Sequence, residues 1–537
     1  MSRSDDRPWW QTAVVYQVYP RSFRDTTGSG IGDLRGIIEK LEYLTGVLGV
    51  DTVWLSPFYP SPMADFGYDV SDYCDVHPMF GTLDDFDRLL ARAHTLRLRI
   101  VVDFVPSHTS DRHPWFAESR ASRTSPRRDW YVWRDPKPDG APPNNWLSVF
   151  GGSAWEPDER TGQYYRHSFL REQPDLNWRH PPLRAALLDV MRFWLDRGVD
   201  GFRVDAVQFM LKDPAERDNP PNPDGEGRAH KPLGAYDSQL HVYDLAHPDI
   251  HQVFRDMRAV TDAYDPPRMT LGEVHVYDPV ELGTYYGAAL DGLSMPTNFG
   301  LFRTPWTAAG VRAVVDGLEA GLPSGAWPNY SLGNHDDRRL ATRLGEAGSR
   351  QAAVLLLTLR GTPILYYGDE IGMREAAVPP SRRQDPWGIA APELSRDGCR
   401  TPMPWSAALG AGFTSAADPW LPLGDDWKTR NVESQLGEPD SLLNLHRRLL
   451  ALRRETPPLR AGSYRPLDAV PDDCFVFSRI RARQRVLVGI NFSSEPRPVS
   501  LPGFTGRVAV STHRAAEGSA VGRAITLRPH EAAVLVE

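Results

Sequence analysis

Cysteine is scarce in this chain: its 537 residues include three, Cys74, Cys399 and Cys474. They are odd in number, lie far apart and lack the spacing of metal ligands, which excludes a disulfide framework and a cysteine-based zinc site. Buried free thiols in a reducing compartment fit this pattern, so a cytoplasmic location is expected.

Long apolar runs and blocks of one charge are also missing. No run approaches the ~18 apolar residues of a membrane span, and residues 1–10 have no apolar stretch typical of a signal peptide. Acidic and basic residues are mixed, with a net charge of −8 and a pI near 6.0. This composition argues against a membrane or nucleic-acid partner, and a monomer or homodimer is expected.

Aromatic residues, by contrast, are abundant. They make up 10% of the chain and include 16 Trp, within a hydrophobic content of 41%. Such a chain can bury a large core and should form more than one domain. Flat aromatic rings suit the packing of cores and also the binding of sugar rings.

Short β-forming segments alternate with segments of helical periodicity along most of the chain. Eight segments are predicted as strands, near residues 13–19, 52–55, 99–104, 200–204, 269–273, 292–293, 329–332 and 362–366. Helices are predicted near 34–48, 183–197, 278–287, 308–321, 347–359 and 440–454, and one begins at the capping-box-like segment Thr82–Asp85. The alternation implies parallel strands with crossover helices, and eight units predict a closed (β/α)8 TIM barrel.

Three regions depart from this alternation. Residues 107–176 are rich in loop signals and aromatics, which indicates an ordered B subdomain inserted after the third strand. Residues 212–247 form a second polar, proline-rich excursion. The barrel is therefore predicted over 1–106 and 177–455, and short alternating segments over 456–537 predict a C-terminal antiparallel β domain.

Ionisable residues collect where the predicted strands end. Arg203 and Asp205 share one face at the end of strand four, a pattern that on its own is better explained by an internal salt bridge. His108 follows strand three, Glu273 ends strand five and Asn334–Asp337 end strand seven. Each alone fits a surface or capping residue. A barrel brings all of them to one rim, which predicts an active site.

Paired carboxylates across a pocket suit the cleavage of a glycosidic bond. The nucleophile must stay ionised, and Arg203 beside Asp205 favours its charged form. The proton donor must hold its proton, and Glu273 has no cation adjacent in sequence. Asp205 is therefore predicted as nucleophile, Glu273 as acid/base and Asp336 as a third carboxylate that grips the sugar.

These residues resemble the α-amylase superfamily, glycoside hydrolase family 13. Four motifs carry the resemblance, in the order typical of the family: Asp103-Phe-Val-Pro-Ser-His108, Gly201-Phe-Arg-Val-Asp205, Gly272-Glu-Val-His275 and Asn334-His-Asp-Asp337. The resemblance implies a retaining double displacement in which Asp205 attacks, Glu273 donates the proton and Asp336 stabilises the transition state. It also implies that 107–176 is the family's B domain and the β tail its C domain.

Within the superfamily the chain is most similar to the α-glucosidase and oligo-1,6-glucosidase branch. The motifs are Ala64-Asp-Phe-Gly-Tyr-Asp69, Gln173-Pro-Asp-Leu-Asn177 and Cys399-Arg-Thr-Pro-Met-Pro-Trp405. The resemblance implies that six residues hold a terminal glucose: Asp65, Tyr68, His108, Arg203, His335 and Arg400. Phe150 and Phe169 are candidates for the pocket entrance, although core packing explains each equally well.

The resemblance implies an exo-acting α-glucosidase for short α-glucosides. Ala206, directly after the predicted nucleophile, resembles enzymes that prefer α-1,4 bonds, since α-1,6-specific relatives tend to carry Val there. Maltose-sized substrates and transfer of glucose to small acceptors are expected. The alternatives are an oligo-1,6-glucosidase, an isomerase that makes trehalose or isomaltulose, and a non-catalytic interaction protein, which the retained carboxylates disfavour.

A loop near the first strand departs from the family's metal site. Asp25-Thr-Thr-Gly-Ser-Gly-Ile-Gly-Asp33 keeps both outer aspartates, but Thr27 and Ser29 replace the inner oxygen ligands. Affinity for Ca²⁺ or Mg²⁺ should fall. The loop is therefore expected to be empty or weakly occupied, and no cofactor is required for the chemistry.

Overall fold

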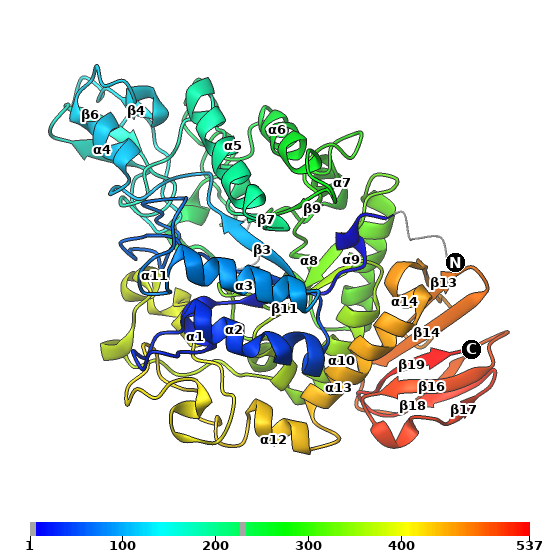
Figure 1. Ribbon diagram of the computed structural model, residues 1–537. Helices are drawn as coiled ribbons and strands as arrows, with labels where there is room; N and C mark the ends of the chain where they lie inside the picture. Colours follow the sequence, from blue (N-terminus) through cyan, green and yellow to red (C-terminus); the bar gives the residue numbers. More distant parts are fainter. Residues whose placement is uncertain (1–6, 226–231) are drawn as a thin grey trace.

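The computed structural model describes residues 7–225 and 232–537. Its central element is a ring of parallel strands (Figure 1). In chain order they are β1 (Val15–Val18), β2 (Thr52–Leu55), β3 (Arg99–Phe104), β7 (Gly201–Val204), β8 (Met269–Gly272), β9 (Met295–Pro296), β10 (Asn329–Ser331) and β11 (Thr362–Tyr366). These eight strands confirm the predicted barrel.

The barrel is nearly closed, with β9 and β10 at the two ends of the strand order. The Asn329 side chain bridges them: its Nδ2 donates to the Pro296 carbonyl at 2.7 Å and its Oδ1 accepts from the Asn298 N–H at 3.2 Å. One buried amide therefore joins the two ends of the sheet.

Helices surround the strands (Figure 1). They are α1 (Pro20–Phe23), α2 (Leu34–Glu42), α3 (Leu83–Thr95), α5 (Pro181–Asp196), α6 (Ile250–Asp262), α7 (Pro279–Thr284), α8 (Gly300–Arg303), α9 (Ala308–Gly321), α10 (Leu340–Thr358), α11 (Pro386–Ala390), α12 (Val432–Gly437), α13 (Leu442–Glu455) and α14 (Pro457–Ala461). The predicted capping box at Thr82 and Asp85 is present at the start of α3. Among the described helices, none is long and apolar enough to span a bilayer.

The insertion after β3 is ordered. It contains α4 (Pro114–Ala121) and a small antiparallel sheet of β4 (Trp133–Arg134), β6 (Gln163–Arg166) and β5 (Trp155–Asp158). The second excursion packs against it: Trp146 Nε1 donates to the Arg217 carbonyl at 2.8 Å, and Asn145 Nδ2 donates to the Asn219 carbonyl at 2.8 Å. Both segments therefore cover the same side of the barrel.

The C-terminal segment forms antiparallel sheets, as predicted. A six-stranded sheet contains β12 (Ser463–Pro466), β13 (Cys474–Arg481), β14 (Gln484–Asn491), β19 (Ala532–Val536), β16 (Gly506–Ser511) and β17 (Ala520–Val521), and β15 (Arg497–Ser500) pairs with β18 (Ala524–Leu527). These strands lie at the opposite side of the molecule from the β4–β6 sheet (Figure 1). The exact domain boundaries stay predictions.

Three details differ from the sequence-based expectations. The sixth strand lies at Met295–Pro296 rather than near 292–293, because the Leu293 N–H is used in a turn to the Tyr285 carbonyl at 2.9 Å. Helix α6 was not predicted. The predicted helix 34–48 is α-helical only to Glu42 and continues as a π-helical turn over Tyr43–Leu48.

Candidate active site

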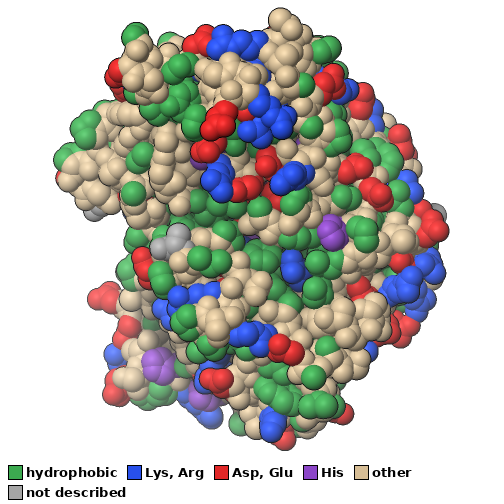
Figure 2. Space-filling view, turned by 90° about the vertical axis from the view of Figure 1, so that its left-hand side faces the viewer, with side chains coloured by type: hydrophobic (Ala, Val, Ile, Leu, Met, Phe, Trp, Pro, Cys, Tyr) green, Lys and Arg blue, Asp and Glu red, His purple; other side chains and the backbone are tan. Residues whose placement is uncertain are grey.

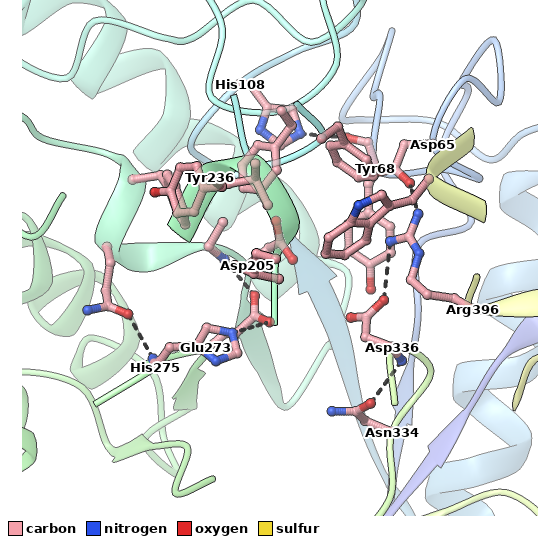
Figure 3. Close-up of a pocket in the computed structure, with 18 of the residues that line it drawn as sticks. Asp65, Tyr68, His108, Asp205, Tyr236, Glu273, His275, Asn334, Asp336 and Arg396 are labelled. Carbon is pink, nitrogen blue, oxygen red and sulfur yellow. Dashed lines mark hydrogen bonds and ion pairs between the residues drawn. The ribbon is translucent and has the colours of Figure 1, made fainter. Parts of the chain in front are cut away.

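A pocket opens where the barrel strands end, and most of the predicted site residues line it (Figure 3). Eight of them are on its surface: Asp65, Tyr68, His108, Phe150, Phe169, Asp205, Glu273 and Asp336. The other three, Arg203, His335 and Arg400, lie directly behind and bond to lining residues. Strands far apart in sequence thus deliver their ionisable ends to one cavity.

Asp205 and Glu273 extend from neighbouring strands at the same level. The Glu273 N–H donates to the Val204 carbonyl at 2.9 Å, which continues the ladder between β7 and β8. Neighbouring strands lie about 4.8 Å apart, so the two side chains start close together. One guanidinium then holds both: Arg203 Nη1 is 2.5 Å from Asp205 Oδ1 and Nη2 is 2.9 Å from Glu273 Oε2.

This geometry corrects the electrostatic argument made for Glu273. It was expected to lack a nearby cation, but Arg203 contacts it directly and His275 Nε2 lies 3.3 Å from its Oε1. Burial acts to raise the pKa of Glu273, yet Arg203 and His275 outweigh it and lower that pKa to about 2. Burial and the charge of Glu273 raise the pKa of Asp205 although Arg203 acts to lower it, so Arg203 alone does not keep Asp205 ionised as expected. Arg203 and His275 thus favour the ionised form of Glu273.

Asp336 lies on the other side of the pocket, in the loop after β10 (Figure 3). Its Oδ1 is 2.8 Å from Arg400 Nη2 and 3.2 Å from Arg396 Nη1. His335 Nε2 lies 3.3 Å from Asp336 Oδ2 and 2.7 Å from the Tyr68 hydroxyl. Burial lowers the pKa of His335 to about 3, so its ring is neutral near pH 7 and acts through hydrogen bonds.

Arg396 is a pocket residue that sequence reasoning missed. Its Nη2 is 2.7 Å from both Asp65 Oδ1 and Asp385 Oδ1, and its guanidinium lies over the Phe150 ring at 5.4 Å. Arg400, predicted to contact glucose, is instead fully buried, and its Nε donates to the His335 carbonyl at 2.7 Å. Arg396 precedes Arg400 by four residues on the same loop, and this nearness in sequence could have identified it as a site residue.

His108 anchors the upper edge of the pocket (Figure 3). Its Nε2 is 3.1 Å from the Tyr68 carbonyl and 3.0 Å from Gln173 Nε2, and Gln173 Nε2 in turn donates to Asp65 Oδ2 at 3.3 Å. Burial lowers the pKa of His108 to about 4, so this ring is also neutral. The Phe169 ring packs beside it, 5.1 Å between centroids.

Most of the remaining lining residues were not predicted. Ala206 had been singled out, and His275, Asn334 and Asp337 belong to the quoted motifs without an assigned role. The others are Val149, Gln208, Phe209, Leu233, Tyr236, Leu245 and Trp387. Several come from the second excursion and from α11, whose sequences carry no catalytic motif. Proximity in space, not sequence pattern, assigns them to the site.

The carboxylates of the Asp25–Asp33 loop accept hydrogen bonds from neighbouring groups of the protein. The oxygens of Asp25 accept from the N–H groups of Thr27, Gly28 and Gly30 at 2.8–3.0 Å and from the Thr414 hydroxyl at 2.5 Å. Asp33 caps α2 by accepting from the Gly36 N–H at 2.7 Å. Among the described residues, no cluster of three or more His, Cys, Asp or Glu could hold a metal ion. Hydrogen-bond donors of the protein thus satisfy the carboxylates of Asp25 and Asp33. No catalytic step is assigned to a metal.

The class of this protein follows from the barrel, the pocket and the family comparison. The family model for the α-amylase catalytic domain matches residues 17–462. The chain belongs to the α-amylase family and is a glycoside hydrolase.

Relatives place it within the α-glucosidase and oligo-1,6-glucosidase branch. It is 45% identical to a probable α-glucosidase of Rhizobium meliloti (strain 1021), over 93% of this chain and 92% of that protein. It is 38% identical to an oligo-1,6-glucosidase of Parageobacillus thermoglucosidasius, over 98% and 99%.

Solved structures share this fold. An α-glucosyl transfer enzyme superposes with a TM-score of 0.93 at 44% identity, covering 99% of this chain and all of the other. The trehalulose synthase of Pseudomonas mesoacidophila MX-45 superposes with a TM-score of 0.89 at 37% identity, covering 99% of each chain.

Proposed function

We propose that this enzyme is a retaining, exo-acting α-glucosidase that releases glucose from the non-reducing end of short α-glucosides. The observation that carries the proposal is the pairing of Asp205 and Glu273 from adjacent strands on one guanidinium, inside one pocket. Such closeness suits direct attack by a carboxylate rather than by an intervening water. Two relatives named as glucosidases, and trehalulose synthase variants solved with sucrose and with isomaltulose, support a small-molecule glucoside as substrate.

In the first step, an Asp205 oxygen attacks the anomeric carbon while Glu273 protonates the departing oxygen, and the glycosidic bond breaks. Glu273, now a carboxylate, then takes a proton from water or from an acceptor hydroxyl, whose oxygen displaces Asp205. Asp336 and the neutral His335 hold sugar hydroxyls as the ring distorts. Because Arg203 and His275 favour ionised Glu273, we expect substrate binding to raise its pKa by excluding water.

Arg396 supports the exo mode. It closes one side of the pocket by bridging Asp65, Asp336 and Asp385, so that a chain cannot continue past this point. We propose that Asp65 and Arg396 clamp adjacent hydroxyls of the terminal glucose. Arg400 then holds Asp336 in place from behind.

Preference for α-1,4 bonds in maltose-sized substrates, with transfer of glucose to small acceptors, is the finer part of the proposal. Ala206 lines the pocket beside Asp205, and its N–H donates to Glu273 Oε2 at 2.9 Å. Initial rates on maltose, isomaltose, maltotetraose, trehalose and sucrose, with every product identified, test it. Faster turnover of isomaltose than of maltose would overturn the linkage preference and favour the oligo-1,6-glucosidase alternative.

A sugar isomerase is the second candidate, because the fold superposes closely on a trehalulose synthase. The same carboxylates serve both reactions, and the outcome depends on whether the leaving group is retained and re-attached. Conversion of sucrose into another disaccharide, with little free glucose, would favour the isomerase. A cytoplasmic location, the oligomeric state and the lack of a nucleic-acid partner stay predictions; on the face seen in Figure 2, acidic and basic side chains are interspersed.

A further inference from the structure

The two carboxylate oxygens of Glu273 have different partners. Oε2 accepts from the Ala206 N–H at 2.9 Å and lies 2.9 Å from Arg203 Nη2. Oε1 lies 3.3 Å from His275 Nε2 (Figure 3). An oxygen whose two lone pairs both accept N–H donors has no room for a proton, so the proton that Glu273 donates must be on Oε1. The acidic proton is therefore next to an imidazole nitrogen.

The backbone and the ring of His275 are both held in place. Its backbone N–H donates to Gln208 Oε1 at 2.7 Å, and Gln208 Nε2 donates to the Tyr285 hydroxyl at 3.3 Å. The His275 ring stacks on Phe299, with centroids 4.6 Å apart and planes 6° apart. These contacts keep Nε2 directed at the Glu273 carboxylate.

The charges around Glu273 require a source for its proton. Although burial acts to raise the pKa of Glu273, Arg203 and His275 lower it to about 2. A carboxyl group with that pKa is ionised near pH 7, yet cleavage of the glycosidic bond needs its proton. The other charged groups that face this carboxylate are Arg203, Asp103, Asp205 and Asp336, and Asp337 lines the same pocket. His275 is the ionisable group that contacts Oε1.

Exclusion of water favours transfer of a proton from the imidazole to the carboxylate. An imidazolium beside a carboxylate is stabilised by the water that solvates both charges. The pair has access to that water, because the His275 side chain is 30% exposed and the Glu273 side chain 15%. A sugar that covers the pair removes the water, and a neutral imidazole beside a carboxylic acid becomes the more stable form. Substrate binding thus moves the proton to Glu273.

We propose that His275 stores the proton that Glu273 delivers to the leaving group. The inference rests on the proposed function, in which Glu273 is the acid/base. When substrate binds, the Nε2–H bond of His275 breaks and an O–H bond forms at Glu273 Oε1. This proton passes to the glycosidic oxygen as Asp205 attacks and the glycosidic bond breaks. In the second step, water or an acceptor hydroxyl gives its proton to Oε1. The proton returns to His275 when the product leaves and water enters.

The test compares two substrates in the parent enzyme and in His275→Gln, which keeps an amide donor but carries no titrating proton. The ratio kcat/KM reports the first, glucosylation step. For maltose it should fall by about 10²-fold, the effect of an impaired general acid. For 4-nitrophenyl α-glucoside, whose phenolate leaves with little protonation, it should fall by less than about threefold. His94→Gln is the matched control, because His94 Nε2 pairs with Asp200 Oδ2 at 2.9 Å outside the pocket.

The pH profile of kcat/KM for maltose gives the second readout. In the parent enzyme its alkaline limb follows loss of the proton shared by His275 and Glu273. In His275→Gln it follows Glu273 alone, whose ionised form Arg203 still stabilises. The alkaline limb should therefore move to lower pH by about one unit or more.

The outcomes separate the two proposals. If the parent enzyme releases no glucose from maltose or any other α-glucoside, the proposed function is wrong, and the inference with it. If the parent enzyme is active, equal losses on both substrates, unchanged rates or an unmoved alkaline limb in His275→Gln would overturn the inference alone. Near-UV circular dichroism and the rate on 4-nitrophenyl α-glucoside both check that the variant is folded.

Discussion

The two sides of the catalytic pocket are built by different parts of the chain. Asp205, Glu273 and Asp336 stand at or just beyond the ends of barrel strands, on backbone fixed by the parallel ladder. The apolar side, a cluster of Val149, Tyr236 and Trp387 with the rings packed on it, comes from segments inserted between those strands and helices. It meets the polar side where the Phe150 and Trp387 rings lie against Arg396. A rigid scaffold for bond breaking is thus combined with replaceable loops for choosing the leaving group.

The two sides also differ in what holds them. On the polar side each carboxylate has a cation partner: Arg203 serves Asp103, Asp205 and Glu273, and Arg396 serves Asp65. On the apolar side, ring packing dominates. Charge changes should therefore act on the rate and its pH dependence, whereas changes to the apolar side should act on substrate choice.

The largest effect should come from Asp205→Asn. Loss of the attacking carboxylate should lower kcat for maltose by about 10⁴-fold or more, while the apolar side keeps its affinity for an aryl glucoside. Steady-state rates and equilibrium binding of a slowly cleaved aryl α-glucoside would check this. A variant with more than a tenth of the parent kcat would contradict the assignment of the nucleophile.

A matched pair of arginine variants should distinguish a residue that contacts the sugar from one that positions Asp336. Arg396→Lys loses the planar fork that contacts Asp65, and kcat/KM for maltose should fall by about 10- to 100-fold, mostly through KM. Arg400→Lys, behind Asp336, should act mainly on kcat. Equal rises of KM in both variants would indicate that Arg400 contacts glucose, as the resemblance implied.

The fall of Tm at low pH should depend on the ion pair between Asp385 and Arg396, which lies behind the polar side. Burial tends to raise the pKa of Asp385, but Arg396 and its hydrogen bonds outweigh this and lower that pKa from 3.8 to about 2. The stabilisation is present above pH 3.8 and is lost as pH falls toward 2, a change of about 2 kcal/mol. Asp385→Asn should therefore show a lower Tm at pH 6 and a flatter fall of Tm below pH 4. An unchanged slope in thermal melts would contradict this.

A smaller effect is expected from Ala206→Val, at the junction of the two sides. Ala206 has φ 44°, and a β-branched residue is strained there. The added methyl groups should narrow the pocket beside Asp205 and raise the isomaltose-to-maltose rate ratio several-fold, with Tm lower by a few degrees. Rates on isomaltose and maltose measured side by side check this prediction. An unchanged rate ratio would show that Ala206 does not determine linkage preference.

The smallest effect is expected outside both sides, at the Asp25–Asp33 loop. Because loop donors satisfy Asp25 and Asp33, chelation of divalent cations should change neither kcat nor Tm measurably. Parallel assays and melts with EDTA and with added Ca²⁺ would test this. A Tm rise of several degrees with Ca²⁺ would show a working metal site.

The barrel could be predicted because its signals are local. Short β-rich runs mark each strand, and a capping box starts α3. The sixth strand was predicted at the wrong residues because β9 has two residues, too few to show the alternation of a strand. Domain boundaries and residue roles stay predictions.

The pocket was predictable where motifs follow strands and was missed where segments meet only in space. Asp205 and Glu273 were found, but the contact between Arg203 and Glu273 crosses from β7 to β8, which no sequence spacing reveals. Tyr236 lies in a short 3-10 helix and Arg396 directly precedes another, and neither segment has a strand signal. Lateral neighbours and loop packing therefore required coordinates.

The Asn329 amide described above sets where heat should first damage this enzyme. It is a single side-chain bridge at the seam between β9 and β10, while every other pair of barrel neighbours shares a backbone ladder. If the seam parts, Asp336, downstream of β10, moves away from Glu273, downstream of β8. On warming, the enzyme would then lose activity before most of its secondary structure unfolds.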